Sequence, residues 1–572
     1  MAGQDRKLEL ILCWHMHQPD YRNYQTGEFE LPWTYLHAIK DYTDMAYHLE
    51  QFPGARAVFN FVPVLLDQLE SYAAAFDSNQ ITDPLLRLLA QDDLSALSNE
   101  QRAFILASCF RCNHATMIQP FPHYKHLLDM YKMLEEQGEA AMVYLSAQYL
   151  SDLLVWYHLA WTGESVRREH DLVIKLMSKG GHFSYTDREA LFDLIGELIK
   201  GIIPRYRALL DAGRIEISST PHYHPIAPLL IDFQTAQESS PDSSLPESLD
   251  YPGGRNRVKY HIDSAIASHQ TRFGKPPAGF WPAEGGVSDA FVGLLGQNAC
   301  KWTASGEGVL MNSLHKARPG ILQDKCKTLY RPYQIDGLEG KVKLFFRDDY
   351  LSDLIGFEYA KWHGRDAATS FVRELEQILN KTDGNENPVV TVILDGENAW
   401  EYYSYNGFYF LSDLYEVLHS HPSIRMTTFN DYLSRSETES MAEVGVLSSL
   451  VAGSWVYGNF STWIGSPDKN RAWDLLCAAK RSFDHVVASG RLSETQIAAA
   501  SRQLASCESS DWCWWFGDYN PRLSVESFDK LYRENLANLY WLLQLPVPDA
   551  LSQPVSHGAY NATTTGAMRR AS

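Results

Sequence analysis

Short hydrophobic runs recur along the chain, and each ends abruptly at a polar or charged residue. This pattern is typical of parallel strands that carry side chains to one rim of a barrel. The first run, Leu8–Trp14, stops at His15 and His17, and Pro19 then prevents the strand from continuing. The runs that follow are residues 57–62, 214–220, 280–283, 301–304, 342–346 and 391–394. An α/β barrel is therefore predicted.

Helical periodicity dominates two other regions of the chain. Apolar residues recur at three-to-four spacing between about residues 65 and 203, and again after residue 434. We therefore expect a barrel over residues 1–434, with a helical insertion at about 65–203 that covers one side of its rim. A C-terminal helical domain is expected over residues 435–551. Residues 552–572 are rich in Ser, Ala, Gly and Thr and are predicted to form a disordered tail.

Composition and charge narrow the class of protein. With 572 residues, 45% of them hydrophobic, the chain can bury a large core. Its formal net charge of −20 argues against nucleic-acid or anionic-membrane partners. Residues 1–7 lead straight into the first strand without an apolar signal stretch, and the eight cysteines are scattered in core-like surroundings. We expect a soluble, cytoplasmic enzyme with a neutral substrate.

Two carboxylates at the ends of hydrophobic runs are the leading candidates for catalysis. Glu284 follows Phe280–Ala283 and Asp395 follows Thr391–Leu394, and each lies beside glycine. Cleavage of a glycosidic bond needs such a pair, because one carboxylate attacks the sugar carbon while the other acid protonates the leaving oxygen. Either residue alone fits a solvated loop position or a helix cap equally well. The pair, taken with the histidines described next, favours a catalytic site.

Histidines form the next candidate group. His15 and His17 alternate along a strand and therefore share one face. Two imidazoles on one face serve as metal ligands, as hydrogen-bond partners of polar substrate groups, or as packed core residues. The run at 214–220 places Glu216 inward in a barrel, and His222 and His224 follow it. A buried Glu216 needs polar partners, which His15, His17 or a sugar hydroxyl could supply.

Five short segments occur in an order that matches a known enzyme family. They are His17-Gln18-Pro19, Glu216-Ile217 with the His-rich turn after it, Trp281–Gly285, Leu394–Glu401 and Thr462–Asn470. These segments resemble the motifs of glycoside hydrolase family 57, whose members act on α-glucans, and the last one looks most like the amylopullulanase and α-amylase branch. The resemblance runs from about Leu8 to Trp515. It implies an incomplete (β/α)7 TIM-like barrel and a C-terminal α-helical domain that contributes to the substrate cleft.

The resemblance also implies roles for particular residues. Glu284 matches the nucleophile of the family and Asp395 its general acid/base. Glu216 and His224 fall in the second motif, where the family presents polar contacts to substrate, and the nearby His222 is an alternative to His224. No metal and no cofactor are implied. The residues that match substrate contacts are His15, His17, Glu216, His224, Trp281, Trp400, Trp463 and Asp468.

The implied function is that of a retaining glycoside hydrolase. It would cleave α-1,4 bonds, with α-1,6 bonds as a further option, in starch- or glycogen-type glucans or maltooligosaccharides. Transfer to another glucan, as in a 4-α-glucanotransferase or a branching enzyme, uses the same covalent intermediate and is the alternative. A rival from another class is a metal-dependent deacetylase or amidohydrolase, with the histidines at 15, 17, 222 and 224 around a metal and Asp395 as base. That rival leaves Glu284 without a role. A third alternative is a non-catalytic glucan-binding protein, which would not need both carboxylates.

Overall fold

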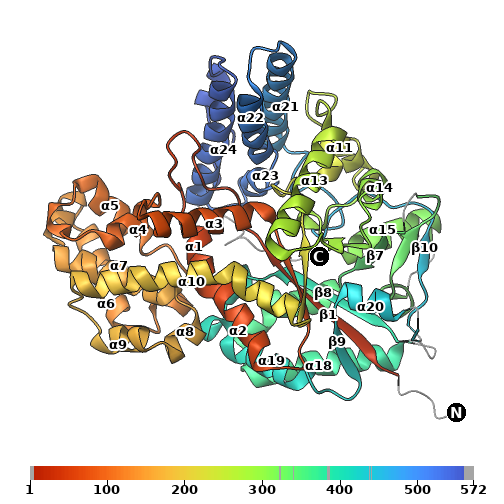
Figure 1. Cartoon of the computed structure of the whole chain (residues 1–572), viewed down its shortest axis with the longest axis horizontal. Helices are drawn as coiled ribbons and strands as arrows, with labels where there is room; N and C mark the ends of the chain where they lie inside the picture. The colour runs from red at the N-terminus through yellow and green to blue at the C-terminus, as the bar shows by residue number, and fades with distance from the viewer. Residues whose placement is uncertain are drawn as a thin grey trace.

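One curled sheet of ten strands forms the centre of this α/β protein (Figure 1). The computed structural model describes residues 6–320, 324–338, 341–382, 387–436, 438–439 and 441–559. The strands follow the order β10-β6-β7-β5-β4-β3-β2-β1-β8 across the sheet, with β9 also paired to β1. They are β1 (Leu8–Met16), β2 (Ala57–Phe61), β3 (Ile215–Ser219), β4 (Gly279–Phe280), β5 (Trp302–Ser305), β6 (Tyr333–Ile335), β7 (Lys343–Phe346), β8 (Val389–Asp395), β9 (Ile424–Thr427) and β10 (Gly445–Leu447).

The strands from β7 through β5, β4, β3, β2 and β1 to β8 form an unbroken parallel array. β6 pairs antiparallel with β7, and β10 extends that edge. The carboxyl ends of parallel strands meet at the same edge, so the residues that follow β1, β3, β4 and β8 lie on one rim. This topology brings together the segments that carry His17, His224, Glu284 and Asp395.

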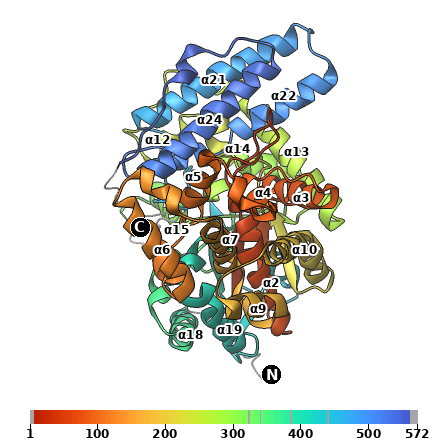
Figure 2. The same ribbon diagram turned by 90° about the vertical axis from the view of Figure 1, so that its left-hand side faces the viewer.

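A block of helices separates β2 from β3 and lies at the left of Figure 1. Figure 2 shows the same block from its outer side, below the C-terminal helices. The block consists of α3 (Pro63–Ser78), α4 (Pro84–Ala90), α5 (Asn99–Ser108), η3 (His114–Ile118), α6 (Pro122–Glu135), α7 (Ala147–Trp161), α8 (Glu164–Glu169), α9 (Asp171–Lys179) and α10 (Tyr185–Asp211).

The remaining helices of the barrel region connect its strands. They include α1 (Trp33–His37), η1 (Ala38–Tyr42), α2 (Thr43–Gln51), α11 (Ala227–Ile231), α12 (Thr235–Ser239), α13 (Gly254–Phe273), α14 (Asp289–Gln297), α15 (Glu307–Ala317) and α16 (Lys325–Thr328). The later ones are α17 (Asp349–Asp353), η6 (Leu354–Glu358), η7 (Tyr359–Lys361), α18 (Gly364–Lys381), η8 (Asn398–Tyr402), η9 (Ser404–Gly407), α19 (Phe408–Leu418) and α20 (Phe429–Arg435).

Helix α20 fills the interior of the curled sheet below the rim. Its Phe429 stacks on Trp302 of β5 with ring centroids 3.8 Å apart and lies edge-on to Phe345 of β7. β9, which precedes α20, pairs with the first half of β1, whereas β2 pairs with the second half. β9 and β2 therefore pair with the same side of β1, one after the other. We call the gap between them the fork, and α20 enters the interior of the sheet there.

The C-terminal helices stand above the rim, at the top of Figures 1 and 2. They are α21 (Pro467–Ala488), α22 (Glu494–Cys507), α23 (Asp511–Trp515) and α24 (Arg522–Leu542). Of the predicted tail, the described residues 552–559 pack near α24, where Val555 and Ser556 are buried and both backbone amides donate to Asp529. The rest of that tail lies outside the described residues. No helix in the described ranges is long and apolar enough to cross a membrane.

Candidate active site

One cavity opens at the rim of the parallel array, with a volume of about 260 Å³. The barrel loops, the helical block and the C-terminal helices all contribute to its wall. Charged groups and aromatic rings face the same space, which suits a polar ligand with flat apolar faces. The lining includes His15, His17, Arg111, His224, Glu284, Arg347, Asp395, Glu397, Trp455, Asp511, Trp514, Trp515 and Phe528.

Glu284 lines the cavity from a strained backbone position. It lies in the short helical turn η5 (Ala283–Gly285) after β4 and has a φ of +57°, in the left-handed region that residues other than glycine rarely adopt. The indole Nε1–H of Trp455 donates to Glu284 Oε2 at 2.9 Å, and the Trp455 amide donates to the Glu284 carbonyl at 3.0 Å. Trp455 thus binds both the backbone and the side chain of Glu284. A donor at the carboxylate favours its ionised form, as a nucleophile requires.

Asp395 lines the same cavity at the end of β8. Asn398 Nδ2 donates to Asp395 Oδ2 at 2.9 Å. Burial raises the pKa of Asp395, and the charge of Asp511 adds to the rise. The Asn398 hydrogen bond and the charges of His17 and Arg347 oppose it. The net rise favours the protonated carboxyl that a general acid needs.

Glu397 was not among the predicted site residues, although it lines the cavity two positions after Asp395. Its Oε1 accepts hydrogen bonds from the His17 amide at 3.0 Å and from Gln18 Nε2 and the Tyr42 hydroxyl at 3.2 Å each. Its Oε2 is buried without a hydrogen-bond partner among the described residues. Burial and the nearby Asp395 charge raise the pKa of Glu397 well above its ordinary value. Oε2 therefore has hydrogen-bonding capacity that no described residue uses.

Three histidines form a stack on the cavity wall. The rings of His17 and His224 lie 3.8 Å apart, and those of His15 and His224 lie 5.2 Å apart. Each ring is held by one polar partner: His15 Nδ1 by Asn60 at 2.6 Å, His17 Nε2 by Asp511 at 2.9 Å, and His224 Nδ1 by Ser510 at 2.8 Å. Burial lowers the pKa of His15 to about 3 and that of His224 well below its ordinary value. Both therefore stay neutral at pH 7.

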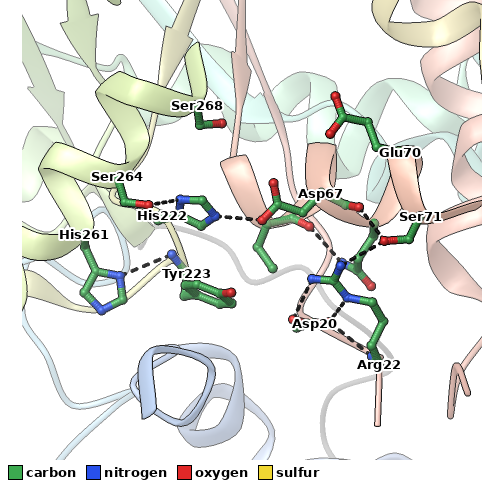
Figure 3. Close-up of polar contacts among 12 residues, drawn as sticks. Asp20, Arg22, Asp67, Glu70, Ser71, His222, Tyr223, His261, Ser264 and Ser268 are labelled. Atoms are coloured by element: carbon green, nitrogen blue, oxygen red, sulfur yellow. Dashed lines mark hydrogen bonds and ion pairs between the residues drawn. The ribbon is translucent and has the colours of Figure 1, made fainter. Parts of the chain in front are cut away.

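The structure distinguishes His224 from His222. His224 has a φ of +58° and turns into the cavity, whereas His222 is not among the lining residues. Figure 3 shows His222 between helix α13 and helix α3, where its Nδ1 meets the Ser264 hydroxyl at 2.7 Å and its Nε2 meets Asp67 at 2.8 Å. Burial opposes ionisation of Asp67, but His222 and Arg272 outweigh it and lower the pKa of Asp67 to about 2. His222 thus anchors the loop that presents His224.

The expected partners of Glu216 were wrong. The side chain does point inward, but it lies below the cavity, where Trp302 Nε1 donates to it at 2.8 Å and the Asn430 amide at 2.9 Å. Neither His15 nor His17 contacts it through a hydrogen bond among the described residues. Burial raises its pKa. The carboxylate therefore caps the first turn of α20 instead of facing the substrate space.

Three tryptophans that match substrate contacts are buried outside the cavity lining. Trp281 packs edge-on against Trp455, with ring centroids 5.3 Å apart, and so supports a ring that does line the cavity. Trp400 donates to the Gly396 carbonyl at 2.8 Å, and Trp463 packs against Trp514. Asp468 lies in the first turn of α21, also outside the lining. Each of the three tryptophans lies one layer behind the wall.

Several lining residues escaped the sequence analysis. Asp511 comes from α23, far from any strand end, and no local pattern marks it as a barrel-site residue. Trp455 precedes the last matched segment. Arg347, the residue after β7, lines the cavity and forms a largely buried ion pair with Asp349 at 2.8 Å. Its guanidinium also lies 4.9 Å from the centre of the Trp455 ring.

His17, His224 and Asp511 could in principle hold a metal ion, because their donor atoms lie within 4.8 Å of one another. The rings of His17 and His224 are nearly parallel, however, with an interplanar angle of 21°. Their in-plane lone pairs therefore do not converge on one point, as tetrahedral coordination requires. Because His222 lies outside the cavity, the four-histidine centre of the deacetylase alternative is not assembled.

Comparison with known proteins gives a consistent result. The sequence model described as glycosyl hydrolase family 57 matches residues 11–445. No match was found among curated protein sequences. A branching enzyme of that family from the archaeon Thermococcus kodakaraensis, crystallised with glucose, is a similar solved structure. It has a TM-score of 0.56 and 16% identity, over 94% of this chain and 90% of that chain.

Two further solved structures are similar along their whole length. A branching enzyme from Pyrococcus horikoshii has a TM-score of 0.55 and 15% identity, over 97% of both chains. The α-amylase AmyC from Thermotoga maritima has a TM-score of 0.54 and 15% identity, over 95% of both chains. At these identities the likeness is one of fold.

Proposed function

The chain belongs to glycosyl hydrolase family 57, and from this we propose that it is a retaining hydrolase of α-1,4 bonds in starch- or glycogen-type glucans. The observation that carries the proposal is the position of Glu284 and Asp395 on the wall of one cavity, among aromatic rings. We also propose that the seven-stranded parallel array is the incomplete (β/α)7 barrel implied by the sequence. Branch points with α-1,6 bonds are a second target.

In the first step of this mechanism, ionised Glu284 attacks the anomeric carbon of the bound sugar. Asp395 gives its proton to the glycosidic oxygen, and the leaving chain departs. Trp455 keeps the Glu284 carboxylate in place, and burial favours the protonated form of Asp395. Neutral His15 and His224, together with Glu397, supply hydrogen-bond partners for sugar hydroxyls.

In the second step, Asp395 acts as a base. It removes a proton from water, which attacks the glycosyl-enzyme and releases Glu284. A sugar hydroxyl in place of water would give transfer instead, so a 4-α-glucanotransferase or branching activity is the alternative. The rings of Trp514, Trp515 and Phe528 offer apolar surface on which an acceptor sugar could rest.

Product analysis with a linear maltooligosaccharide tests the proposal. Wild-type enzyme should give shorter products with new reducing ends, and the first product should keep the α configuration at its new anomeric carbon. Glu284→Gln should lower turnover by at least about 10³-fold, because the amide is not a nucleophile. Glu494→Gln, at an exposed position in the first turn of α22, is the matched control and should turn over at the wild-type rate.

Each outcome decides between the activities. If both longer and shorter products form without a net gain of reducing ends, the reaction at this site is transfer and not hydrolysis. A β-configured first product would contradict the retaining mechanism. Near-normal turnover by Glu284→Gln would remove Glu284 from the nucleophile role.

A further inference from the structure

Two tyrosines with exposed rings follow β8 and the cavity residues after it. Tyr405 in η9 and Tyr409 in the first turn of α19 are 53% and 48% exposed, and we call them the tyrosine platform. The rings of Tyr405 and Tyr409 meet edge-to-face with centroids 5.5 Å apart. Glu401, which precedes the platform in the chain, lines the cavity. The platform is thus continuous in sequence with the proposed catalytic loop but faces solvent.

The backbone under the platform is strained. Tyr405 and Asn406 have φ values of +53° and +55°, and Gly407 follows with +71°. Two consecutive residues other than glycine rarely adopt this conformation, because their Cβ atoms crowd the backbone. Such strain persists only where surrounding contacts impose it, and it concentrates at functional positions.

Buried polar contacts impose this strain. Asn406 is buried, and its Oδ1 accepts from Lys40 Nζ at 2.9 Å while its Nδ2 donates to Asp44 at 3.0 Å. Lys40 and Asp44 are themselves almost fully buried. Asp44 also accepts from the Glu164 amide at 2.7 Å, which links the turn to helix α8. These contacts hold the Asn406 side chain in the protein interior. The neighbouring Tyr405 ring is consequently exposed to solvent.

A cation holds the second ring of the platform. The Arg168 guanidinium lies 4.9 Å from the ring centre of Tyr409, and its Nη2 donates to the Tyr409 hydroxyl at 3.0 Å. It is also 6.0 Å from the centre of the Tyr405 ring and bonded to Glu164 at 2.8 Å. The two rings are therefore preorganised, with little rotational freedom to lose when a ligand binds.

We propose that the tyrosine platform is an outlying binding surface for an α-glucan chain, which rests on the function proposed above. Fixed aromatic faces bordered by hydroxyl and guanidinium donors match the alternating C–H faces and hydroxyl edges of a glucan. The platform follows Asp395 closely in the chain. A long glucan that occupies the cavity can therefore extend over the platform. A short oligosaccharide held in the cavity alone would not reach it.

Binding to an inactive enzyme tests the proposal directly. In the Glu284→Gln background, Tyr405→Asn removes a ring but keeps a residue that tolerates the left-handed conformation. We expect this change to weaken glycogen binding about ten-fold and to leave the dissociation constant of maltotriose unchanged. Tyr409→Ala, within helix α19, should act in the same way. Trp541→Ala, at a 58% exposed tryptophan on α24, is the matched control and should bind glycogen like the parent.

The results separate this proposal from the proposed function. If both tyrosine variants bind glycogen as tightly as the parent, the platform is not a glucan surface, whatever wild-type enzyme does to maltooligosaccharides. If both variants lose maltotriose binding as strongly as glycogen binding, the effect is on the cavity and the proposal fails. If the parent binds neither sugar, the function proposed above fails together with the platform.

Discussion

Glu284 and Asp395 occupy environments that match the different protonation states of a nucleophile and a general acid. Glu284 receives an indole N–H at its carboxylate, which stabilises negative charge. Asp395 is desolvated, which stabilises the neutral acid, and the neighbouring Asp511 charge acts in the same direction. Two carboxyl groups on one cavity wall can therefore take two roles without any difference in their intrinsic chemistry.

Two substitutions should move the basic limb of the pH profile in opposite directions. Asn398→Ala removes a hydrogen bond that favours ionised Asp395, so the pKa of Asp395 should rise and activity should persist to higher pH. Asp511→Asn removes a negative charge that favours protonated Asp395, so the pKa should fall and activity should be lost at lower pH. A general acid works only below its pKa, which sets both signs. The measurement is kcat/KM against pH.

A shift of both profiles in the same direction would contradict this assignment. It would mean that the group which limits the reaction at high pH is not Asp395. Asp511→Asn should also lower kcat/KM at the optimum, because Asp511 holds His17 at 2.9 Å.

Sequence could locate the two catalytic candidates but not every neighbour. Glu284 and Asp395 are marked by hydrophobic runs that end at a carboxylate beside glycine. His222 and His224 could not be separated, because the choice depends on the positive φ of His224, and nothing in the local pattern indicates it. Asp511 reaches the cavity through the packing of α23 against the barrel, which is a tertiary contact without a periodic signal.

At the scale of elements, helix α20 explains why two matched residues lie beneath the site. Its Phe429 and Tyr432 occupy the interior together with Trp281, Trp302 and other inward-facing residues. Glu216 caps its first turn, and Trp281 packs above it against Trp455. Helix α20 therefore lies beneath the cavity, whose wall includes the strand residues His15 and Leu394.

Glu216→Ala should destabilise the protein while leaving the chemistry intact. The change removes the acceptor of two buried donors and leaves a cavity, at a cost of about 2–4 kcal/mol. Glu216→Gln keeps one acceptor oxygen and should cost less. Thermal unfolding measures the loss, and kinetics at a temperature where both proteins are folded should give kcat and KM within about two-fold of wild type. A raised KM with unchanged thermal stability would restore Glu216 to a substrate role.

Elements with a hydrophobic run or strong periodicity were predictable, whereas β9 and α20 were not. The predicted strand at 8–14 is β1 (Leu8–Met16), and the helical periodicity predicted after residue 434 includes α21 (Pro467–Ala488). β4 spans Gly279–Phe280 alone, which gives no measurable alternation. β9 and α20 follow α19 within a segment that carries no run long enough to mark an interior helix. Their position follows from the fork beside β1, which only the folded sheet reveals.

At the scale of the whole molecule, a buried polar cluster fastens the C-terminal helices to the barrel. Glu508, at the end of α22, accepts from Arg257 Nε at 2.7 Å and Nη2 at 2.9 Å, and from the Tyr251 hydroxyl at 2.5 Å. His261 Nε2 meets it at 2.7 Å. Two and three residues later, Ser510 and Asp511 hold the histidine stack. The junction and the site are thus parts of one segment.

Glu508→Gln should therefore affect both stability and catalysis. It leaves Arg257 buried with an uncompensated charge, a loss of about 3–5 kcal/mol, and it loosens the segment that places Asp511 beside His17. The unfolding temperature and kcat/KM should both fall. Lys259→Gln, on the same helix α13, breaks only an exposed pair with Asp263 and should change stability by less than about 1 kcal/mol. A destabilised Glu508→Gln enzyme with full kcat/KM would show that the site does not depend on this junction.

The same cluster should make the junction sensitive to acid. Burial alone would raise the pKa of Glu508, but Arg257 and His261 outweigh it and lower the pKa from its ordinary 4.5 to about 2. A carboxyl group with a lowered pKa stabilises the fold above its unfolded-state pKa, and that contribution disappears as the pH falls through the folded-state value. Wild-type enzyme should therefore lose stability between pH 4.5 and about 2 more steeply than Glu508→Gln, which has no carboxyl group to protonate there. Equal slopes in that range, measured by thermal unfolding, would mean that Glu508 is not ionised at the junction.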